Sequence, residues 1–210
     1  GKAELEAGPK TLTVESDWSS ASYFYSIIAL STLGTQVSRS TYKKDSLQGD
    51  AVLKDIYRQM GVETSFEASR IILKKTTNTL PPLIDIDLAN APDIAQTIAV
   101  TCFGLGASCE LLGLHTLKIK ETDRLEALKE ELTNLGALIS VTNDSLHLER
   151  SSEINQNIAI KTYNEHRMAM AFAPLALKVP IKILNAEVVT KSFQKFWDDM
   201  QQIGIKIEEL

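Results

Sequence analysis

The chain has 210 residues, of which 44% are hydrophobic and 23% are charged, and its formal net charge is −5. This composition is ordinary for a globular protein, and the acidic balance argues against a general nucleic-acid binder. No apolar run approaches the roughly 20 residues of a membrane-spanning helix, and the N-terminus lacks the apolar core of a secretory signal. We therefore expect a cytoplasmic protein with no nucleic-acid or membrane partner.

Residues 1–14 contain two glycines and a proline, which is typical of a connecting segment. We interpret them as a connection from a preceding part of a longer protein. No further linker is evident in residues 15–210, so we expect one α/β domain there. The two cysteines, Cys102 and Cys109, lack the spacing of a zinc or redox motif and are expected to be buried thiols.

Three apolar, alanine-rich stretches of the chain each begin with polar residues. Aligning Ser20, Asp93 and His166 places them at two equal intervals of 73 residues (20 to 93 and 93 to 166), which indicates a repeated structural unit. Because the stretches are apolar on nearly all sides, we predict three buried helices whose N-termini open onto a common face. They cover residues 19–34, 92–106 and 165–178.

A second helix is predicted in each unit, amphipathic and followed by a glycine that suits the left-handed end of a helix. These helices should lie on the outside and end near Gly61, Gly136 and Gly204. Strand-like runs lie between the helices, so each unit is expected to follow the order strand, helix, strand, helix, strand, strand. The runs include residues 69–75, 138–149, 181–189 and 205–210.

The predicted helix starts collect charged side chains. Helix N-termini carry unpaired N–H groups and a partial positive charge, and they bind anions well. Cations gathered there in an acidic chain indicate a phosphorylated or carboxylated small ligand, which Arg can bind bidentately and Lys as a point charge. We expect Lys120, Arg124, Arg167 and Lys191 to converge on one small anion. Asp93, Glu121, Glu165 and His166 lie in the same segments.

The chain resembles the EPSP synthase family in five segments that occur in the family's order: SDWSSASYF, APDIAQTIA, LKIKETDRL, TYNEHRMAM and VTKSFQKF. The resemblance covers residues 14–200. It implies the α/β fold of that family, an inverted α/β barrel domain of three βαβαββ repeats with three buried helices. Such an enzyme has two of these domains joined by two crossovers. Residues 1–14 would then be a crossover segment from an absent N-terminal domain, and residues 15–210 the C-terminal domain.

The activity implied by the resemblance is transfer of the enolpyruvyl group of phosphoenolpyruvate to the 5-hydroxyl of shikimate 3-phosphate, with release of phosphate. The reaction proceeds by addition and elimination through a tetrahedral intermediate and implies no metal or organic cofactor. Its partners would be the two substrates and the absent domain of the same enzyme. Because that domain holds the other half of the site, we expect the 210 residues alone to be inactive.

The resemblance also assigns roles to individual residues. Asp93, Glu121 and Lys191 would be catalytic: Asp93 binds the shikimate hydroxyls and acts as a base, while Glu121 and Lys191 serve in proton transfer. The substrate-binding residues would be Asp93, Thr116, Lys120, Arg124, His166, Arg167 and Lys191. Two positions depart from the usual pattern, since Glu165 stands in place of aspartate and Thr116 in place of asparagine.

Plainer interpretations stay open for these residues. Asp93 can be only a helix cap, and Glu121 and Arg124 can simply pair with each other. Asp17 is interpreted as a cap or hinge residue. The alternatives for function are a UDP-N-acetylglucosamine enolpyruvyl transferase of the same fold, or a non-catalytic half domain that binds anions.

Overall fold

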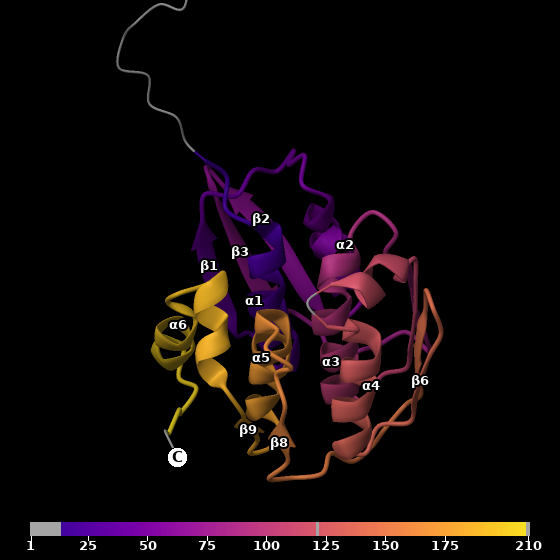
Figure 1. The fold of residues 1–210 in the computed structure, drawn as a ribbon. Coiled ribbons are helices and arrows are strands. Elements are labelled where there is room, and N and C mark those ends of the chain that lie inside the picture. The colour runs from indigo at the N-terminus through magenta and orange to yellow at the C-terminus, as the bar shows by residue number, and fades with distance from the viewer. Residues whose placement is uncertain (1–13, 121, 209–210) are drawn as a thin grey trace, which may run out of the picture.

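The computed structural model describes residues 14–120 and 122–208 of the chain. Figure 1 shows the path of the chain through these residues. The helices are α1 (Trp18–Leu30), α2 (Leu53–Arg58), α3 (Ala95–Leu105), α4 (Arg124–Asn134), α5 (His166–Phe172) and α6 (Phe196–Gln202). The strands are β1 (Gln36–Ser40), β2 (Val62–Glu67), β3 (Arg70–Lys75), β4 (Ile84–Asp87), β5 (Cys109–Leu112), β6 (Ile139–Val141), β7 (Leu146–Leu148), β8 (Ala159–Ile160) and β9 (Lys182–Ile183).

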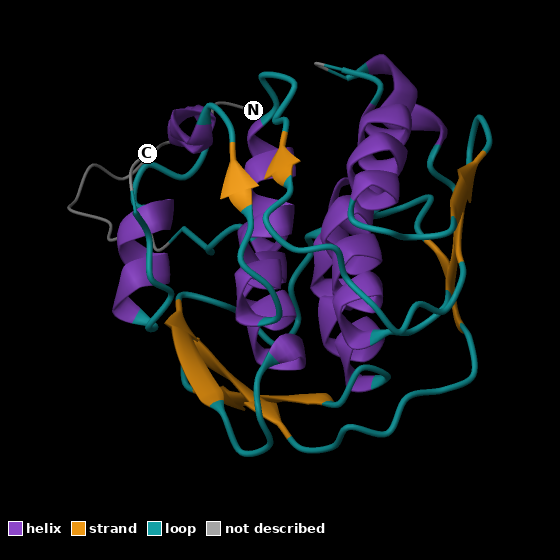
Figure 2. Cartoon of the chain, turned by 90° about the horizontal axis from the view of Figure 1, so that it is seen from below, coloured by secondary structure: helices purple, strands orange, loops and turns teal. Residues whose placement is uncertain are grey.

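The strands form three separate sheets at the periphery, with helices between them (Figure 2). The first sheet is antiparallel in the order β1-β3-β2. The second has the order β4-β5-β7-β6, with β4 parallel to β5 and the other pairs antiparallel. In the third, β8 pairs with β9 in parallel. Parallel pairs need a crossover connection, which α3 supplies between β4 and β5 and α5 between β8 and β9.

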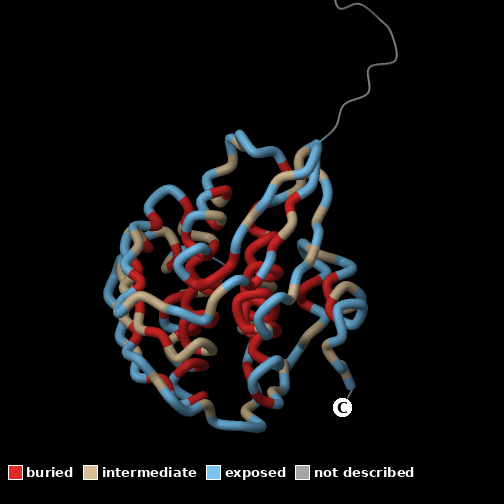
Figure 3. Tube along the Cα trace, turned by 180° about the vertical axis from the view of Figure 1, so that it is seen from behind, coloured by how far each residue is buried: buried red, intermediate tan, exposed pale blue. Residues whose placement is uncertain are grey.

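The three predicted buried helices are α1, α3 and α5, and α3 packs against both of the others. Figure 3 shows the buried residues gathered on these central helices. Apolar side chains such as Phe24, Ile98 and Phe172 are at most 1% exposed. A Cβ atom on Gly104 of α3 would approach a terminal side-chain carbon of Leu30 to 2.7 Å, so the glycine lets the leucine side chains of the neighbouring helices pack closely. The prediction of three buried helices is confirmed.

The second helix of each unit also has the predicted character. In α2 and α6 only one face is buried, and α4 turns its charged face outward. Gly61, Gly136 and Gly204 follow these helices with φ values of +79°, +99° and +96°, the conformation that favours glycine. No helix in the described part of the chain is long and apolar enough to cross a membrane.

The predicted order of elements is complete in the middle unit, where β4, α3, β5, α4, β6 and β7 follow one another. In the third unit two strand predictions are wrong. Residues 181–189 form a strand only at β9, because Asn185 adopts a left-handed conformation (φ 52°) and the chain continues as a 3₁₀ helix, Ala186–Lys191. Residues 205–208 form no strand, since no described segment pairs with them. The interpretation of residues 1–14 falls almost entirely outside the described residues.

Candidate functional site

The starts of α1 and α3 border a cavity of about 450 Å³, and Arg167, at the start of α5, contacts Asp93 in its lining. Asp17 caps α1 by accepting hydrogen bonds from the backbone N–H groups of Ser19 and Ser20, as its interpretation as a cap predicted. A short 3₁₀ helix, Pro92–Ile94, leads into α3. The first unit contributes Asp17, Ser19, Gln48, Gly49 and Asp50 to the lining, and the second contributes Asn90, Ala91, Pro92, Asp93, Thr116 and Lys120.

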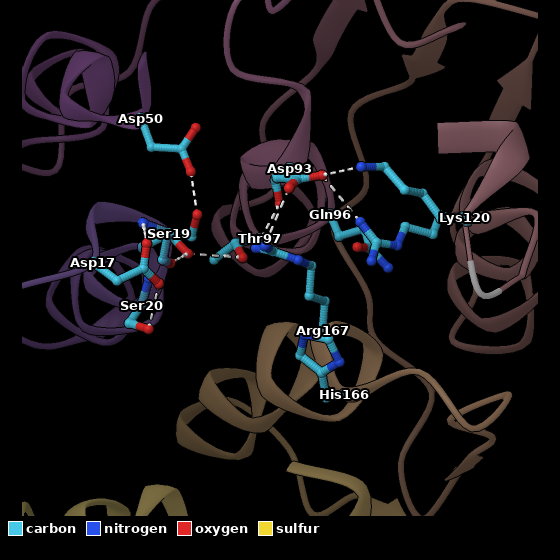
Figure 4. A network of polar contacts seen from close by, with 12 residues as sticks. Asp17, Ser19, Ser20, Asp50, Asp93, Gln96, Thr97, Lys120, His166 and Arg167 are labelled. Carbon is cyan, nitrogen blue, oxygen red and sulfur yellow. Dashed lines mark hydrogen bonds and ion pairs between the residues drawn. The ribbon is translucent and has the colours of Figure 1, made fainter. Parts of the chain in front are cut away.

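Asp93 is the centre of the charged cluster beside this cavity (Figure 4). Its Oδ1 lies 3.1 Å from Nη1 of Arg124 and 3.4 Å from Nζ of Lys120. Its Oδ2 lies 3.2 Å from Nη2 of Arg167. Three cations from two segments of the chain, residues 117–125 and 162–170, therefore share one carboxylate, so the expected convergence is observed for Lys120, Arg124 and Arg167.

The cluster fixes the ionisation of Asp93. Burial opposes the charged form of this carboxyl, but the positive charges of Arg167, Lys120 and Arg124 outweigh it and lower the pKa of Asp93 below its ordinary value. Asp93 is therefore a carboxylate at neutral pH. Asp93 is not a simple cap in this structure, because the N-cap positions of its 3₁₀ helix and of α3 are Ala91 and Ile94.

Glu165 lies beneath the cluster and is fully buried. Its carboxylate accepts hydrogen bonds from Nη2 of Arg124 at 3.2 Å, from the backbone N–H of Arg167 at 3.0 Å and from the side-chain amide of Gln96 at 3.3 Å. Glu165 thus caps α5 and holds Arg124 in one orientation. Only 3% of the Arg124 side chain is exposed. This buried cation is compensated by two carboxylates, those of Asp93 and Glu165.

Two predicted substrate-binding residues flank the cluster. The side chain of His166 is 14% exposed, and its Nδ1 lies 3.4 Å from Oε1 of Glu165. Thr116 lines the cavity, and among the described residues its Oγ1 has no hydrogen-bond partner. A buried hydroxyl in that situation is suited to receive a ligand group.

Lys191 departs from the expected convergence. It ends the 3₁₀ helix Ala186–Lys191, and its exposed ammonium donates to the backbone oxygen and to Oδ1 of Asn164, at 2.7 and 2.9 Å. The three cations paired with Asp93 are Lys120, Arg124 and Arg167. The ammonium of Lys191 contacts the two oxygens of Asn164 instead. Glu121, the remaining predicted catalytic residue, lies outside the described residues.

Sequence reasoning missed three residues of this region. Asp50 lines the cavity, and one of its carboxylate oxygens accepts a hydrogen bond from Ser19. Burial raises the pKa of Asp50 above its ordinary value, although that hydrogen bond opposes the shift. Gln96 contacts Glu165, and Asn164 contacts Lys191. Asn164 and Gln96 stand within the motifs TYNEHRMAM and APDIAQTIA, so a signal existed for both, whereas Asp50 lies outside the five motifs and is brought here only by the fold.

The described residues offer no obvious metal centre. Within residues 14–120 and 122–208, no group of three or more His, Cys, Asp or Glu side chains could hold a metal ion. The cluster instead combines three cations with the carboxylates of Asp93 and Glu165. An incoming phosphate or carboxylate could take over Arg124 and Arg167 from Asp93, because both guanidinium groups prefer such anions.

Comparisons with known proteins find similar sequences and similar folds. The sequence model described as EPSP synthase (3-phosphoshikimate 1-carboxyvinyltransferase) matches residues 1–200. A 3-phosphoshikimate 1-carboxyvinyltransferase of Bacteroides fragilis is 43% identical over 199 residues, which are 93% of this chain and 48% of that relative. A solved structure of EPSP synthase from Acinetobacter baumannii is similar with a TM-score of 0.77 and 25% identity, over 93% of this chain and 47% of that one. The chain thus spans about half the length of the curated relatives it matches.

The fold is shared more widely. The enolpyruvyl transferase NikO from Streptomyces tendae is similar with a TM-score of 0.66 and 13% identity, over 94% of this chain and 45% of that one. At that identity the likeness concerns the fold alone. It agrees with the predicted α/β domain built around three buried helices.

Proposed function

The chain belongs to the EPSP synthase family, and from this premise we propose that it supplies one half of an enzyme that forms 5-enolpyruvylshikimate 3-phosphate. The enolpyruvyl group of phosphoenolpyruvate is transferred to the 5-hydroxyl of shikimate 3-phosphate, and phosphate is released. Residues 15–210 act as the C-terminal domain, residues 1–14 as the crossover, and the partner is a second domain of the same enzyme. The enzyme works in the cytoplasm without a cofactor.

The observation that carries this proposal is the convergence of Lys120, Arg124 and Arg167 on Asp93 at the starts of the buried helices. Such a group suits two anionic substrates, since the guanidinium groups can bind the carboxylate or phosphate of phosphoenolpyruvate. Lys120 and the free hydroxyl of Thr116 then face the shikimate ligand in the adjoining cavity. His166 lies against Glu165, which accepts a hydrogen bond from the backbone N–H of Arg167. His166 thereby helps to position Arg167 for substrate binding.

The chemistry needs three proton transfers, two in the addition step and one in the elimination step. In the addition step the 5-hydroxyl loses its proton as its oxygen bonds to C2 of phosphoenolpyruvate, and C3 gains a proton to become a methyl group. In the elimination step phosphate leaves C2 and the methyl group loses a proton. Asp93 binds the hydroxyl and takes its proton, and its basicity rises when a bound anion draws Arg124 and Arg167 away. Glu121 and Lys191 exchange the proton at C3 and neutralise the departing phosphate.

Activity of a completed enzyme tests this function. The unmatched half of the Bacteroides fragilis relative would be joined to this chain, and phosphate release from phosphoenolpyruvate would be followed with shikimate 3-phosphate. Glu121→Gln and Lys191→Ala should each lower the rate on the order of a hundredfold or more. The matched controls are Glu130→Gln and Lys161→Ala, because these two side chains form an exposed ion pair at 2.9 Å.

Two outcomes would reject the proposal. A folded completed enzyme that releases no phosphate with shikimate 3-phosphate would reject the substrate, and release with UDP-N-acetylglucosamine in its place would favour that alternative. Rates near those of the parent in both Glu121→Gln and Lys191→Ala would reject the assigned roles.

A further inference from the structure

We propose that Asn164 is a positioning residue for Lys191, and that the Tyr163–Asn164 turn fastens this lysine to the helix that carries Arg124. The proposal rests on the proposed function for its catalytic meaning. The claim that Lys191 is anchored depends only on contacts within this chain.

The ammonium of Lys191 is held by two acceptors on one residue. Its Nζ donates to the backbone oxygen of Asn164 at 2.7 Å and to the side-chain Oδ1 at 2.9 Å. An ammonium has three N–H donors, so one donor is left for a ligand. A lysine side chain is long and flexible, and two acceptors on one residue restrict where its end can be. Asn164 therefore selects one position for an otherwise mobile charge.

The acceptors are presented by a turn of the backbone at Tyr163 and Asn164. Tyr163 and Asn164 have φ values of +54° and +56°, so two consecutive residues other than glycine are left-handed. Asparagine adopts this conformation readily, but for a bulky residue such as tyrosine it is an outlier. Backbone strain of this kind is concentrated at functional sites and persists only where the surroundings hold it in place.

Hydrogen bonds to α4 on either side of the turn hold it in place. The hydroxyl of Tyr163 donates to Oε1 of Glu131 at 2.7 Å, and Glu131 is fully buried in α4. Burial and this hydrogen bond raise the pKa of Tyr163, so the hydroxyl remains a donor at neutral pH. On the other side of the turn, Glu165 accepts from Arg124 at 3.2 Å. The turn is thus hydrogen-bonded to α4 on both sides, through Tyr163 and through Glu165.

The two residues of α4 that bind the turn, Arg124 and Glu131, lie on one face of that helix. Arg124 and Glu131 are seven residues apart in α4, which is about two helical turns. Tyr163 and Glu165 therefore dock side by side along α4, and Asn164 lies between them with its two oxygens on Lys191. This arrangement gives Lys191 a fixed place relative to Arg124, although the two residues are far apart in the sequence.

The consequence for the reaction is specific. Loss of the Asn164 side chain should leave shikimate 3-phosphate binding largely intact, because Asn164 does not line the cavity that contains Asp93, Thr116 and Lys120. It should lower the rate of the chemical steps, which depend on where the Lys191 ammonium is held. A general loss of structure would instead lower both binding and thermal stability.

The experiment begins with the chain itself, labelled with ¹³C-lysine. In the parent, an anchored Lys191 should show two distinct Hε chemical shifts. Asn164→Gly keeps the left-handed turn but removes Oδ1, so the two shifts should merge, whereas Asn164→Asp keeps an acceptor oxygen and should retain them. The matched control is Asn157→Gly, because Asn157 is an exposed asparagine with the same left-handed backbone (φ 60°).

The completed enzyme provides the second readout. Asn164→Gly should lower kcat about tenfold while KM for shikimate 3-phosphate changes less than about twofold, and Asn164→Asp should recover most of the lost rate. Merged Hε shifts in the parent chain, or an unchanged kcat in Asn164→Gly, would overturn the proposal. If the completed enzyme makes no product at all, the proposed function fails, and the NMR comparison still decides whether Lys191 is anchored.

Discussion

Two buried cations of this domain are accommodated in different ways. The Arg124 side chain is 3% exposed and lies between the carboxylates of Asp93 and Glu165, at 3.1 and 3.2 Å. Lys75 is 1% exposed, and its ammonium donates a hydrogen bond to the backbone oxygen of Met60 at 2.8 Å, near the end of α2. Burial, with a smaller effect of Lys178, lowers the pKa of Lys75 to about 8.

The difference reflects which end of a helix each cation meets. The C-terminal end of α2 carries a partial negative charge and tolerates the ammonium of Lys75 without a carboxylate. The N-terminal ends of the buried helices are partially positive, so cations gathered there are unfavourable unless acids offset them. Asp93 and Glu165 supply that offset. The arrangement keeps Arg124 and Arg167 available for an anion at a place where they would otherwise be destabilising.

The largest expected effect comes from removing the buried acid. Glu165→Ala would leave Arg124 partly uncompensated and would remove the cap of α5. Breaking a buried ion pair from one side costs about 3–5 kcal/mol of the free energy of unfolding, which urea denaturation of the chain would measure. Glu153→Ala, at an exposed position, is the control and should change stability by less than about 0.5 kcal/mol. A loss under about 1 kcal/mol in Glu165→Ala would mean that Arg124 does not depend on this carboxylate.

A smaller effect of opposite sign is expected at the other cation. Lys75→Met should raise stability at pH 7 by about 1–2 kcal/mol, because an uncompensated buried charge is removed at the expense of one hydrogen bond. The pKa of Lys75 in the folded state is about 8, below its ordinary value of 10.5. The folded state therefore binds fewer protons than the unfolded state between about pH 8 and 10.5, and the parent gains stability as pH rises through that window. The advantage of the variant should therefore shrink by pH 10.5.

The neighbouring Lys74 offers the control for that experiment. It is exposed in the same strand, so Lys74→Met should be nearly neutral at both pH values. If Lys75→Met destabilises the chain at pH 7, the hydrogen bond to Met60 matters more than the buried charge, and the contrast with Arg124 disappears.

Asp93→Asn gives the smallest of the three effects and tests the cluster directly. It should lower stability at pH 7 by about 1 kcal/mol, because three cations lose their shared carboxylate, and it should strengthen binding of sulfate to the chain. The folded pKa of Asp93 is depressed, so its contribution is present above the ordinary pKa and is lost as pH falls below it. The parent and the variant should therefore converge in stability in acid. Unchanged sulfate affinity would contradict the view that Asp93 competes with an anion.

Much of the fold could be predicted because each unit of the repeat has a recognisable local sequence pattern. The apolar stretches at equal spacing predicted α1, α3 and α5, and the glycines predicted the ends of the outer helices. The strands of the third unit could not be predicted in the same way. Ile205 and the residues after it have an alternating pattern, but a strand also needs a neighbour to accept its hydrogen bonds.

The site was predictable to the extent that motifs carry it. The resemblance supplied Asp93, Arg124 and Arg167, which the fold brings together. The contact of Asp50 with Ser19 joins segments 31 residues apart, and that of Gln96 with Glu165 joins segments 69 residues apart, so no local pattern indicates either one. The place of Lys191 depends on a left-handed turn at Asn164, which a sequence pattern does not reveal.

The most direct test of the central claim compares the 210-residue chain with the completed enzyme in one assay of phosphate release from phosphoenolpyruvate. Catalysis needs both substrates held in place and water excluded, which one open domain does not provide. We predict no shikimate 3-phosphate-dependent release by the folded chain alone and clear release by the completed enzyme. Rapid turnover by the chain alone, or none by a folded completed enzyme, would contradict the claim that this domain is half of the active site.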